Sequence, residues 1–136
     1  AVIAPRHYDD VLATVEACIA YDLPVLPRGG GSSLAGQAIG EAVVIDFTKY
    51  LDQVIRIDGP QRRVTVQAGR TLDRLNRNLE NYGLMVGPDP ASGSRATVGG
   101  VIGNNSTGSH SIVYGRLVDH VHSVQAVLSD GGATRL

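Results

Sequence analysis

The stretch Pro27–Gln37, PRGGGSSLAGQ, directly follows a short apolar run that is typical of a strand. Three consecutive glycines weaken most folded segments, because glycine loses more backbone entropy on folding than any other residue. In tight turns, however, successive backbone N–H groups converge on a concave site that attracts anions, and the absence of Cβ atoms lets a phosphate come close. Ser32 and Ser33 add hydroxyl donors. The stretch therefore predicts a binding site for a phosphate or a pyrophosphate.

Two common phosphate-binding loops do not match this stretch. The dinucleotide fingerprint G-x-G-x-x-G requires a glycine where Leu34 stands. Gly31 and Gly36 have the spacing of a P-loop, G-x-x-x-x-G-K-[ST]. The lysine and the hydroxyl residue that complete such a loop are replaced by Gln37 and Ala38, which argues against a nucleoside triphosphatase. Taken alone, the stretch could also be a flexible turn without a ligand.

A second glycine segment spans residues 87–108, GPDPASGSRATVGGVIGNNSTG. Thr97 is placed to cap a short helix of small residues, whose N-terminus would attract an anion through unpaired N–H groups and the helix dipole. Gly99, Gly100 and Gly103 would let that helix press against a flat ligand. Two glycine-rich anion sites in so short a chain favour one long, phosphate-bridged ligand.

Composition excludes several classes of protein. The chain has 136 residues and a formal net charge of -1, and its basic residues are scattered, so we expect no nucleic-acid partner. Cys18 is the only cysteine, which excludes an intrachain disulfide and a cysteine-based metal cluster. No apolar run is long enough to span a membrane, and no secretory signal is visible, so we expect a cytoplasmic protein or one peripheral to the inner membrane face. Because the chain begins without methionine, we also expect a longer parent protein.

The hydrophobic patterns predict an α+β fold. In the first part of the chain, apolar residues at helical spacing alternate with short apolar runs that are typical of strands. These patterns predict a βαβ unit, with a helix at 9–22 and strands at 2–4, 24–27 and 42–46. We expect this unit to form a small lobe of residues 1–48.

From about residue 51 the patterns predict a second, mostly antiparallel lobe of residues 51–136. Its expected elements are a hairpin of strands 53–57 and 62–68, a helix at 72–82, and a hairpin of strands 120–128 and 133–136. Thr71 and Gly83 are placed to cap the start of the helix and to stop it. His120 and His122 would share one face of a strand, as a metal pair or, more simply, as two half-exposed histidines.

Five segments then occur in the order found in one known family: PRGGGSSLAGQAIG, VVIDFTKYLDQVIRID, VTVQAGRTLDRLN, GPDPASGSRATVGGVIGNNSTGS and YGRLVDHV. They resemble the FAD-binding domain of the FAD-linked oxidases, the vanillyl-alcohol oxidase or PCMH-type superfamily. The branch that they resemble most contains glycolate oxidase subunits and D-2-hydroxyacid dehydrogenases. The resemblance covers essentially the whole chain. It implies a PCMH-type fold of two α+β subdomains with FAD between them.

The resemblance also implies a cofactor site. The first glycine stretch would wrap the FAD pyrophosphate, and the second glycine segment would form the opposite wall, with a tyrosine near the flavin end. The residues placed around FAD in this way are Arg28, Gly29, Gly30, Gly31, Ser32, Ser33, Gly36, Gln37, Pro88, Asp89, Ser92, Thr97, Gly99, Gly100, Gly103, Asn104, Gly108 and Tyr114. Some family members bind flavin covalently through a histidine in the first loop. Because Ser32 and Ser33 stand there, we expect noncovalent FAD.

The activity that the resemblance implies is oxidation of a 2-hydroxy acid, of the D-lactate, glycolate or D-2-hydroxyglutarate type, to the 2-oxo acid. FAD carries the redox chemistry in such an enzyme. The family's catalytic and substrate-binding residues and any metal ligands come chiefly from regions outside the resemblance, including a cap domain. We therefore assign no catalytic and no metal-binding residue in this chain, and we expect it to be inactive alone. An iron–sulfur cluster is expected only in a fused or partner region, and an electron-transfer partner would receive the electrons.

Two alternatives remain at this point. One is an enzyme of the same fold with other chemistry, of the UDP-N-acetylmuramate dehydrogenase type, although SLAGQ and PDPAS followed by TVGG argue against it. The other is a non-catalytic module that binds a phosphorylated ligand or a partner protein. Visible flavin absorbance in the purified protein would separate the two flavoenzymes from the binding module.

Overall fold

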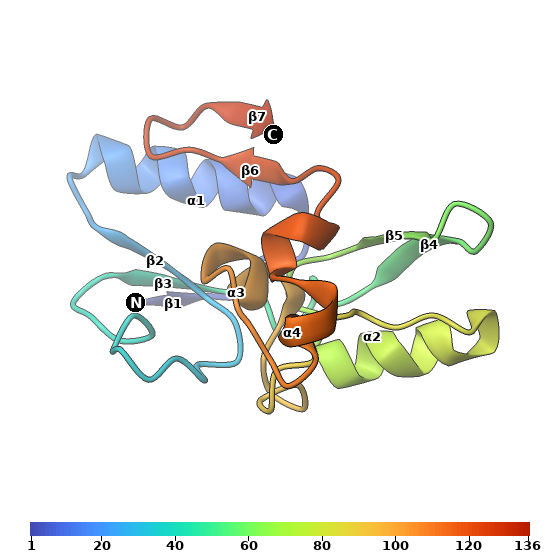
Figure 1. Cartoon of the computed structure of the whole chain (residues 1–136). Coiled ribbons are helices and arrows are strands. Elements are labelled where there is room, and N and C mark those ends of the chain that lie inside the picture. The colour runs from blue at the N-terminus through green and yellow to red at the C-terminus, as the bar shows by residue number, and fades with distance from the viewer.

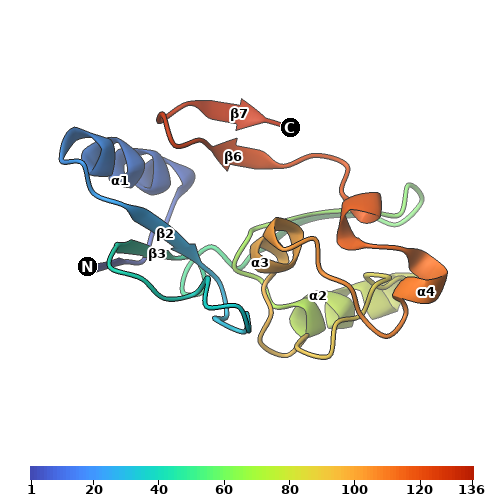
Figure 2. The same ribbon diagram turned by 60° about the vertical axis from the view of Figure 1, so that its left-hand side comes forward.

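The computed structural model describes residues 1–136 and contains both helices and strands. The elements in chain order are β1 (Val2–Ile3), α1 (Tyr8–Ala20), β2 (Val25–Arg28), β3 (Val43–Asp46), β4 (Val54–Asp58), β5 (Arg63–Val66), α2 (Leu72–Leu79), η1 (Glu80–Tyr82), α3 (Val98–Gly103), α4 (Ser111–Tyr114), η2 (Leu117–His120), β6 (Gln125–Val127) and β7 (Ala133–Arg135). The α+β class predicted from the sequence is confirmed. In Figures 1 and 2, α1 and the β1–β3–β2 sheet lie on one side of the molecule, and α2, α4 and the β4–β5 hairpin lie on the other.

The N-terminal βαβ unit is confirmed. Its three strands are parallel and lie in the order β1-β3-β2, with α1 as the crossover between β1 and β2. At the start of α1, the Asp10 carboxylate accepts hydrogen bonds from the backbone N–H groups of Arg6 and His7, at 2.7 and 3.0 Å. These bonds hold the pKa of Asp10 below its usual value, because they favour the charged form. Ile45, on the central strand, is 1% exposed, whereas the edge strand β2 is less buried than a core strand.

The first hairpin and the second helix are also as predicted. Strands β4 and β5 pair antiparallel, and α2 buries its leucine stripe before Gly83 ends the helical segment with a φ of 64°. The expected cap on α2 is wrong in one respect, because the Thr71 side chain makes no capping bond. Thr71 instead forms an isolated antiparallel bridge with Thr97, which fastens the start of α2 to the start of α3. A core cluster lies where these elements meet and consists of Leu72, Ala96, Val101 and Leu117.

The C-terminal hairpin is shorter than predicted. Strands β6 and β7 pair antiparallel, but β6 begins only at Gln125. The preceding residues form the 3-10 helix η2, because the Asp119 carboxylate accepts a hydrogen bond from the Arg116 N–H at 2.8 Å and turns the chain. His120 therefore ends a helix, where its Nε2 lies 2.7 Å from the Tyr114 carbonyl oxygen. The expectation that His120 and His122 share one face of a strand is wrong, and no group of three potential metal ligands exists in the chain.

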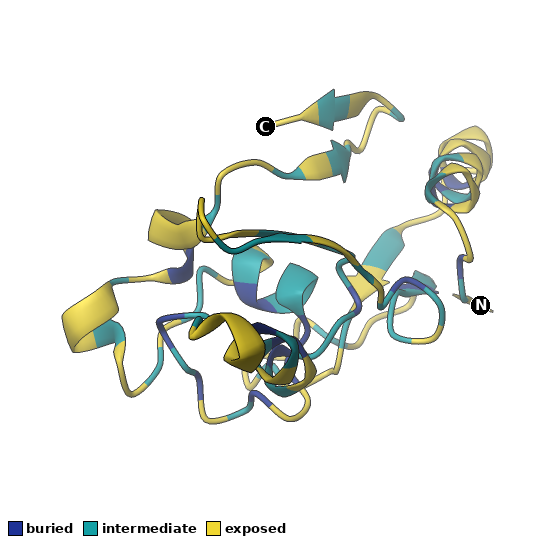
Figure 3. Cartoon of the chain, turned by 90° about the vertical axis from the view of Figure 1, so that its right-hand side faces the viewer, coloured by how far each residue is buried: buried dark blue, intermediate teal, exposed yellow.

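Burial in this structure is uneven. Figure 3 shows the buried residues gathered around α2 and α3, whereas α4 and the β6–β7 hairpin are largely exposed or half-buried. Strand β6 contacts α1, so the C-terminal hairpin lies beside the first helix of the chain (Figure 1). None of the helices has both the length and the apolar character needed to cross a lipid bilayer.

Candidate cofactor-binding site

A cleft of about 270 Å³ lies where the end of β2 meets α3. Its lining combines the two glycine-rich parts of the chain with residues that follow β3 and β5. The lining residues are Pro27, Arg28, Gly29, Phe47, Ala68, Thr97, Gly99, Gly100, Gly103 and Asn104. None of them is acidic, so the lining itself places no carboxylate against an anionic ligand.

The first glycine loop, residues 29–37, offers free hydrogen-bond donors. None of its backbone N–H groups donates a hydrogen bond to another protein atom. Gly31 and Gly36 have φ angles of 66° and 81°, a left-handed conformation that favours glycine. The Arg28 guanidinium folds back against the loop, since a Cβ built on Gly31 would lie 2.7 Å from Arg28 Nη2. Free amides beside a guanidinium form an arrangement that attracts anions.

The two glycine-rich parts of the chain touch each other. Gln37 Nε2 donates a hydrogen bond to Asn104 Oδ1 at 3.0 Å, and Asn104 Nδ2 donates to the Gly100 carbonyl at 2.9 Å. A Cβ on Gly29 would overlap the Thr97 hydroxyl, and a Cβ on Gly30 would overlap the Arg95 carbonyl oxygen. We expected these two glycines to make space for a phosphate. The structure gives a different reason for the two glycines, because the second glycine segment fills the space that their side chains would occupy.

The N-terminus of α3 differs from the expected anion site. Its first N–H groups are already used within the protein, since Val98 N–H donates to the Arg70 carbonyl and Gly99 N–H donates to the Ala68 carbonyl, both at 2.8 Å. The Thr97 hydroxyl accepts from Gly100 N–H at 3.4 Å, so the predicted cap is present. The prediction of unpaired N–H groups at this helix is therefore wrong. The small residues of this helix form one wall of the cleft.

The glycines of α3 do not share one role. A Cβ on Gly99 would come within 2.9 Å of Ala68 Cβ, so this glycine permits close packing inside the protein. A Cβ on Gly103 would meet nothing within 4 Å, although Gly103 lines the cleft. Gly103 is thus the glycine of this helix that faces open space.

Five of the predicted site residues do not line this cleft: Pro88, Asp89, Ser92, Gly108 and Tyr114. Backbone contacts of Pro88, Ser92 and Gly108 shape the second glycine segment. A Cβ on Gly108 would overlap the backbone of Pro88 and Asp89, and the Pro88 carbonyl accepts a hydrogen bond from His110 N–H at 3.3 Å. The Ser92 carbonyl accepts two backbone bonds in the turn before α3.

Of the remaining predicted residues, Gly30, Gly31, Ser32, Ser33 and Gly36 belong to the first glycine loop but do not line the cleft, and Gln37 reaches it only through Asn104. Sequence reasoning missed three lining residues: Pro27, Phe47 and Ala68. Phe47 follows β3, which runs parallel to β2, and the carboxyl ends of parallel strands are where α/β sheets bind ligands. That rule could have found Phe47. Nothing in the local sequence signals Ala68.

A comparison with protein-family models matches residues 1–136 to the family described as FAD binding domain. The chain belongs to this FAD binding domain family. The recognition from the five ordered segments is thereby confirmed, and so is the PCMH-type fold class.

Relatives of this FAD binding domain include two dehydrogenase or oxidase components. The D-2-hydroxyglutarate dehydrogenase of Escherichia coli (strain K12) is 37% identical over 134 residues, which cover 96% of this chain and 13% of that protein. The glycolate oxidase subunit GlcD of Bacillus subtilis (strain 168) is 36% identical over 137 residues, which cover 99% of this chain and 29% of that protein. The chain thus spans less than a third of the length of each of these relatives.

Among solved structures, an alkyldihydroxyacetonephosphate synthase has a similar fold. It superposes with a TM-score of 0.87 at 26% identity, over 99% of this chain and 25% of that chain. Its name describes a different activity from those of the two relatives. The fold alone therefore does not decide the reaction.

The residues present fit part of an FAD molecule. The free amides of the first glycine loop and the Arg28 guanidinium suit a diphosphate, and the uncharged, small-residue wall of α3 suits a flat neighbouring group. Ligand pockets for whole cofactors usually enclose about 300–1,000 Å³. At about 270 Å³, the cleft is smaller than such a pocket.

Proposed function

We propose that this chain is the FAD-binding portion of a flavin-dependent oxidoreductase that oxidises a 2-hydroxy acid to the 2-oxo acid. The observation that carries the proposal is the junction of the two glycine-rich parts at one cleft, with the Gln37–Asn104 hydrogen bond between them. Free amides on one side and a wall without bulky side chains on the other are what a dinucleotide diphosphate requires.

Within this proposal, the first glycine loop and Arg28 bind the diphosphate of FAD. Thr97, the α3 glycines and Asn104 lie along the adjoining ribityl part. Pro88, Asp89, Ser92, Gly108 and Tyr114 shape the segment that leads toward the flavin end. FAD is held without a covalent bond, because serines occupy positions 32 and 33. The two lobes, residues 1–48 and 51–136, enclose the cofactor between them.

FAD supplies the hydride acceptor for the oxidation when it is bound. This chain binds and orients it: its amide donors hydrogen-bond the diphosphate oxygens, and the Arg28 guanidinium offsets part of their negative charge. The groups that bind the substrate and move its proton lie outside residues 1–136 in this proposal, as do an iron–sulfur cluster and the contact with an electron-transfer partner. The support for a 2-hydroxy acid is the naming of the two relatives, one for D-2-hydroxyglutarate and one for glycolate.

The full-length protein tests this proposal directly. It should be purified, scanned for flavin absorbance, and mixed anaerobically with D-lactate, glycolate and D-2-hydroxyglutarate in turn. Bleaching of the flavin band by one of these acids is the expected result. A yellow protein that none of them bleaches would contradict the substrate class. A colourless protein that does not bind added FAD would contradict the cofactor and favour the non-catalytic binding module.

A further inference from the structure

The tripeptide Ala68-Gly69-Arg70 contacts several other segments of the chain beside the cleft. Gly69 N–H donates a hydrogen bond to the Leu51 carbonyl at 2.8 Å. A Cβ on Gly69 would overlap the carbonyl oxygen of Phe47, so the tripeptide is pressed against the chain that leaves β3. Ala68 and Phe47 both line the cleft. The tripeptide thus fixes one wall of the cleft.

The same tripeptide also holds α3, which forms the adjoining part of the lining. The carbonyls of Ala68 and Arg70 accept the first two N–H groups of α3, each at 2.8 Å. In a helix of only six residues, these bonds replace a large part of the internal hydrogen bonding that a longer helix would have. The position of α3 in the fold therefore depends on where residues 68–70 lie.

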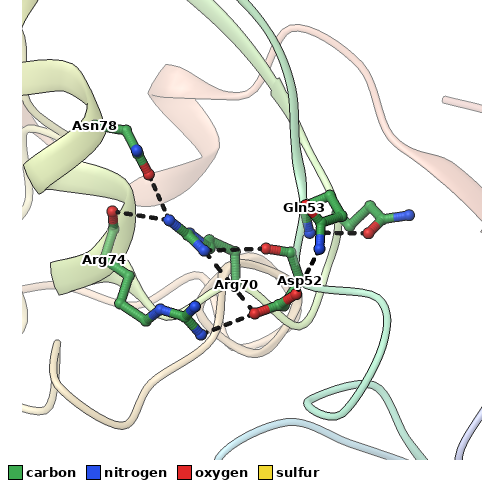
Figure 4. Close-up of polar contacts among 6 residues, drawn as sticks. Asp52, Gln53, Arg70, Arg74 and Asn78 are labelled. Atoms are coloured by element: carbon green, nitrogen blue, oxygen red, sulfur yellow. Dashed lines mark hydrogen bonds and ion pairs between the residues drawn. The ribbon is translucent and has the colours of Figure 1, made fainter.

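The side chain of Arg70 holds this tripeptide in place (Figure 4). Its Nη1 donates to the Asp52 carbonyl at 3.3 Å, and its Nη2 donates to Asn78 Oδ1 at 2.5 Å and to the Arg74 carbonyl at 3.4 Å. The guanidinium therefore joins the segment before β4 to helix α2. Because the Arg70 side chain is only 15% exposed, water competes weakly for these bonds.

The Arg70 side chain also has one unsatisfied donor. Its Nε is buried and has no hydrogen-bond partner, which costs about 1–3 kcal/mol for a typical buried donor. The Asp52 carboxylate already has a partner, since Arg74 Nη1 lies 2.8 Å from its Oδ2, whereas Arg70 Nη1 lies 3.9 Å away. An apolar side chain of similar volume would avoid the cost of the buried donor. It would also lose the three hydrogen bonds of the guanidinium and, with them, the fixed geometry that these bonds impose on the tripeptide.

We propose that Arg70 is a positioning residue for the cofactor cleft, acting through the carbonyls of residues 68 and 70 on α3. This inference rests on the proposed function for its FAD readout. Arg70 itself does not line the cleft. Its removal leaves every lining side chain present and weakens only the attachment of the wall to which several of them belong.

The test uses four variants of the full-length protein: Arg70→Met, Arg70→Lys, Asn78→Ala and, as a matched control, Arg77→Met. Arg77 lies exposed on the same helix as Asn78 and makes no side-chain hydrogen bond. The dissociation constant for FAD is measured by flavin fluorescence at a temperature at which circular dichroism shows every variant folded. Hydrogen exchange of the α3 amides is measured on the same samples without FAD.

Arg70→Met should weaken FAD binding about tenfold and speed exchange of the α3 amides, as expected for the loss of charge-assisted hydrogen bonds. Arg70→Lys should recover part of both effects, because an ammonium can reach Asp52 or Asn78 but lacks the fork. Asn78→Ala should shift both in the same direction by less, and it carries the test if Arg70→Met does not fold. Arg77→Met should change neither.

Folded Arg70→Met and Asn78→Ala proteins with unchanged α3 exchange would overturn the positioning role. The unsubstituted protein could fail to bind FAD while Arg70→Met still speeds exchange of the α3 amides. That result would contradict the proposed function but not the positioning role.

Discussion

The first glycine loop and the second glycine segment are both rich in glycine but use it differently. In the first glycine loop no backbone N–H donates to the protein. In the second glycine segment the N–H groups around α3 are bonded internally, and Gly108 N–H donates to the Ser111 hydroxyl at 2.9 Å. The first region leaves its donors free for a ligand. The second region uses its glycines to bring backbone against backbone.

This difference shows that a glycine-rich sequence does not by itself specify a ligand-binding backbone. Gly99 and Gly108 are required for contact with Ala68 and with the 88–89 backbone. Gly36 and Gly103 have open space beside them. A cofactor cleft formed from both regions therefore needs one part that binds and another that holds the binding part in position. Substitutions of single glycines can separate these two roles.

The largest expected effect comes from Gly30, at the contact between the two regions. Gly30→Val would drive its side chain into the Arg95 carbonyl and separate the first glycine loop from the second glycine segment. FAD affinity of the full-length protein should fall about 100-fold, equivalent to about 2.7 kcal/mol. Isothermal titration calorimetry with FAD measures it. Gly40→Ala is the control, because a Cβ there meets only Leu26 at an ordinary 3.6 Å. Equal affinities of the two variants would show that the contact is unimportant.

Gly108 tests the packing role of the second glycine segment. Gly108→Ala would overlap the backbone of residues 88 and 89, and overpacking of this kind typically costs about 1–3 kcal/mol of folding stability. Urea denaturation followed by circular dichroism measures the loss. A variant as stable as the unsubstituted protein would mean that this segment tolerates the extra carbon and that the packing role is misassigned.

Gly103 gives the opposite pattern. Gly103→Ala enters open space within a helix, where alanine is favoured over glycine by about 0.5–1 kcal/mol, so folding stability should stay the same or rise slightly. Because Gly103 lines the cleft, FAD binding should weaken by about tenfold, or 1.4 kcal/mol. The same calorimetric titration and urea curve apply. Unchanged FAD affinity would remove α3 from the binding surface.

The smallest effect is expected for the bond that joins the two regions. Gln37→Ala removes the donor to Asn104 Oδ1, and an intramolecular hydrogen bond contributes about 0.5–1.5 kcal/mol net. Since both side chains are exposed, the low end applies, and FAD affinity should drop about threefold. Asn104→Asp provides a companion, because it keeps an acceptor for Gln37 while adding a negative charge to the cleft. Its loss of affinity should exceed that of Gln37→Ala, and the reverse order would argue against an anionic ligand.

Much of this architecture could be predicted from local patterns. The βαβ start, the first hairpin and α2 follow from apolar spacing and turn residues, and the structure confirms them. Thr97 was correctly expected to cap α3, because a threonine before a run of small residues is a local signal. The family and its FAD binding domain follow from five ordered segments.

The failures at α3 and at Ala68 share one cause, which is that they depend on contacts between distant residues. The N–H groups of α3 are taken by carbonyls about thirty residues earlier, at Ala68 and Arg70, and no local pattern reports this pairing. Ala68 enters the cleft for the same reason. The missing strand at His120 reflects a competing carboxylate, Asp119, which turned the chain where alternating residues predicted an extended conformation.

Hydrogen–deuterium exchange of the full-length protein, with and without FAD, tests the central claim most directly. The claim is that free amides of residues 29–37 bind the cofactor, while the amides of α3 only support the wall. FAD should slow exchange strongly in peptides that cover residues 29–37 and change it little in peptides that cover Val98–Gly103, whose leading amides are already bonded. Protection confined to Val98–Gly103, with residues 29–37 exchanging at the same rate in both states, would contradict the account.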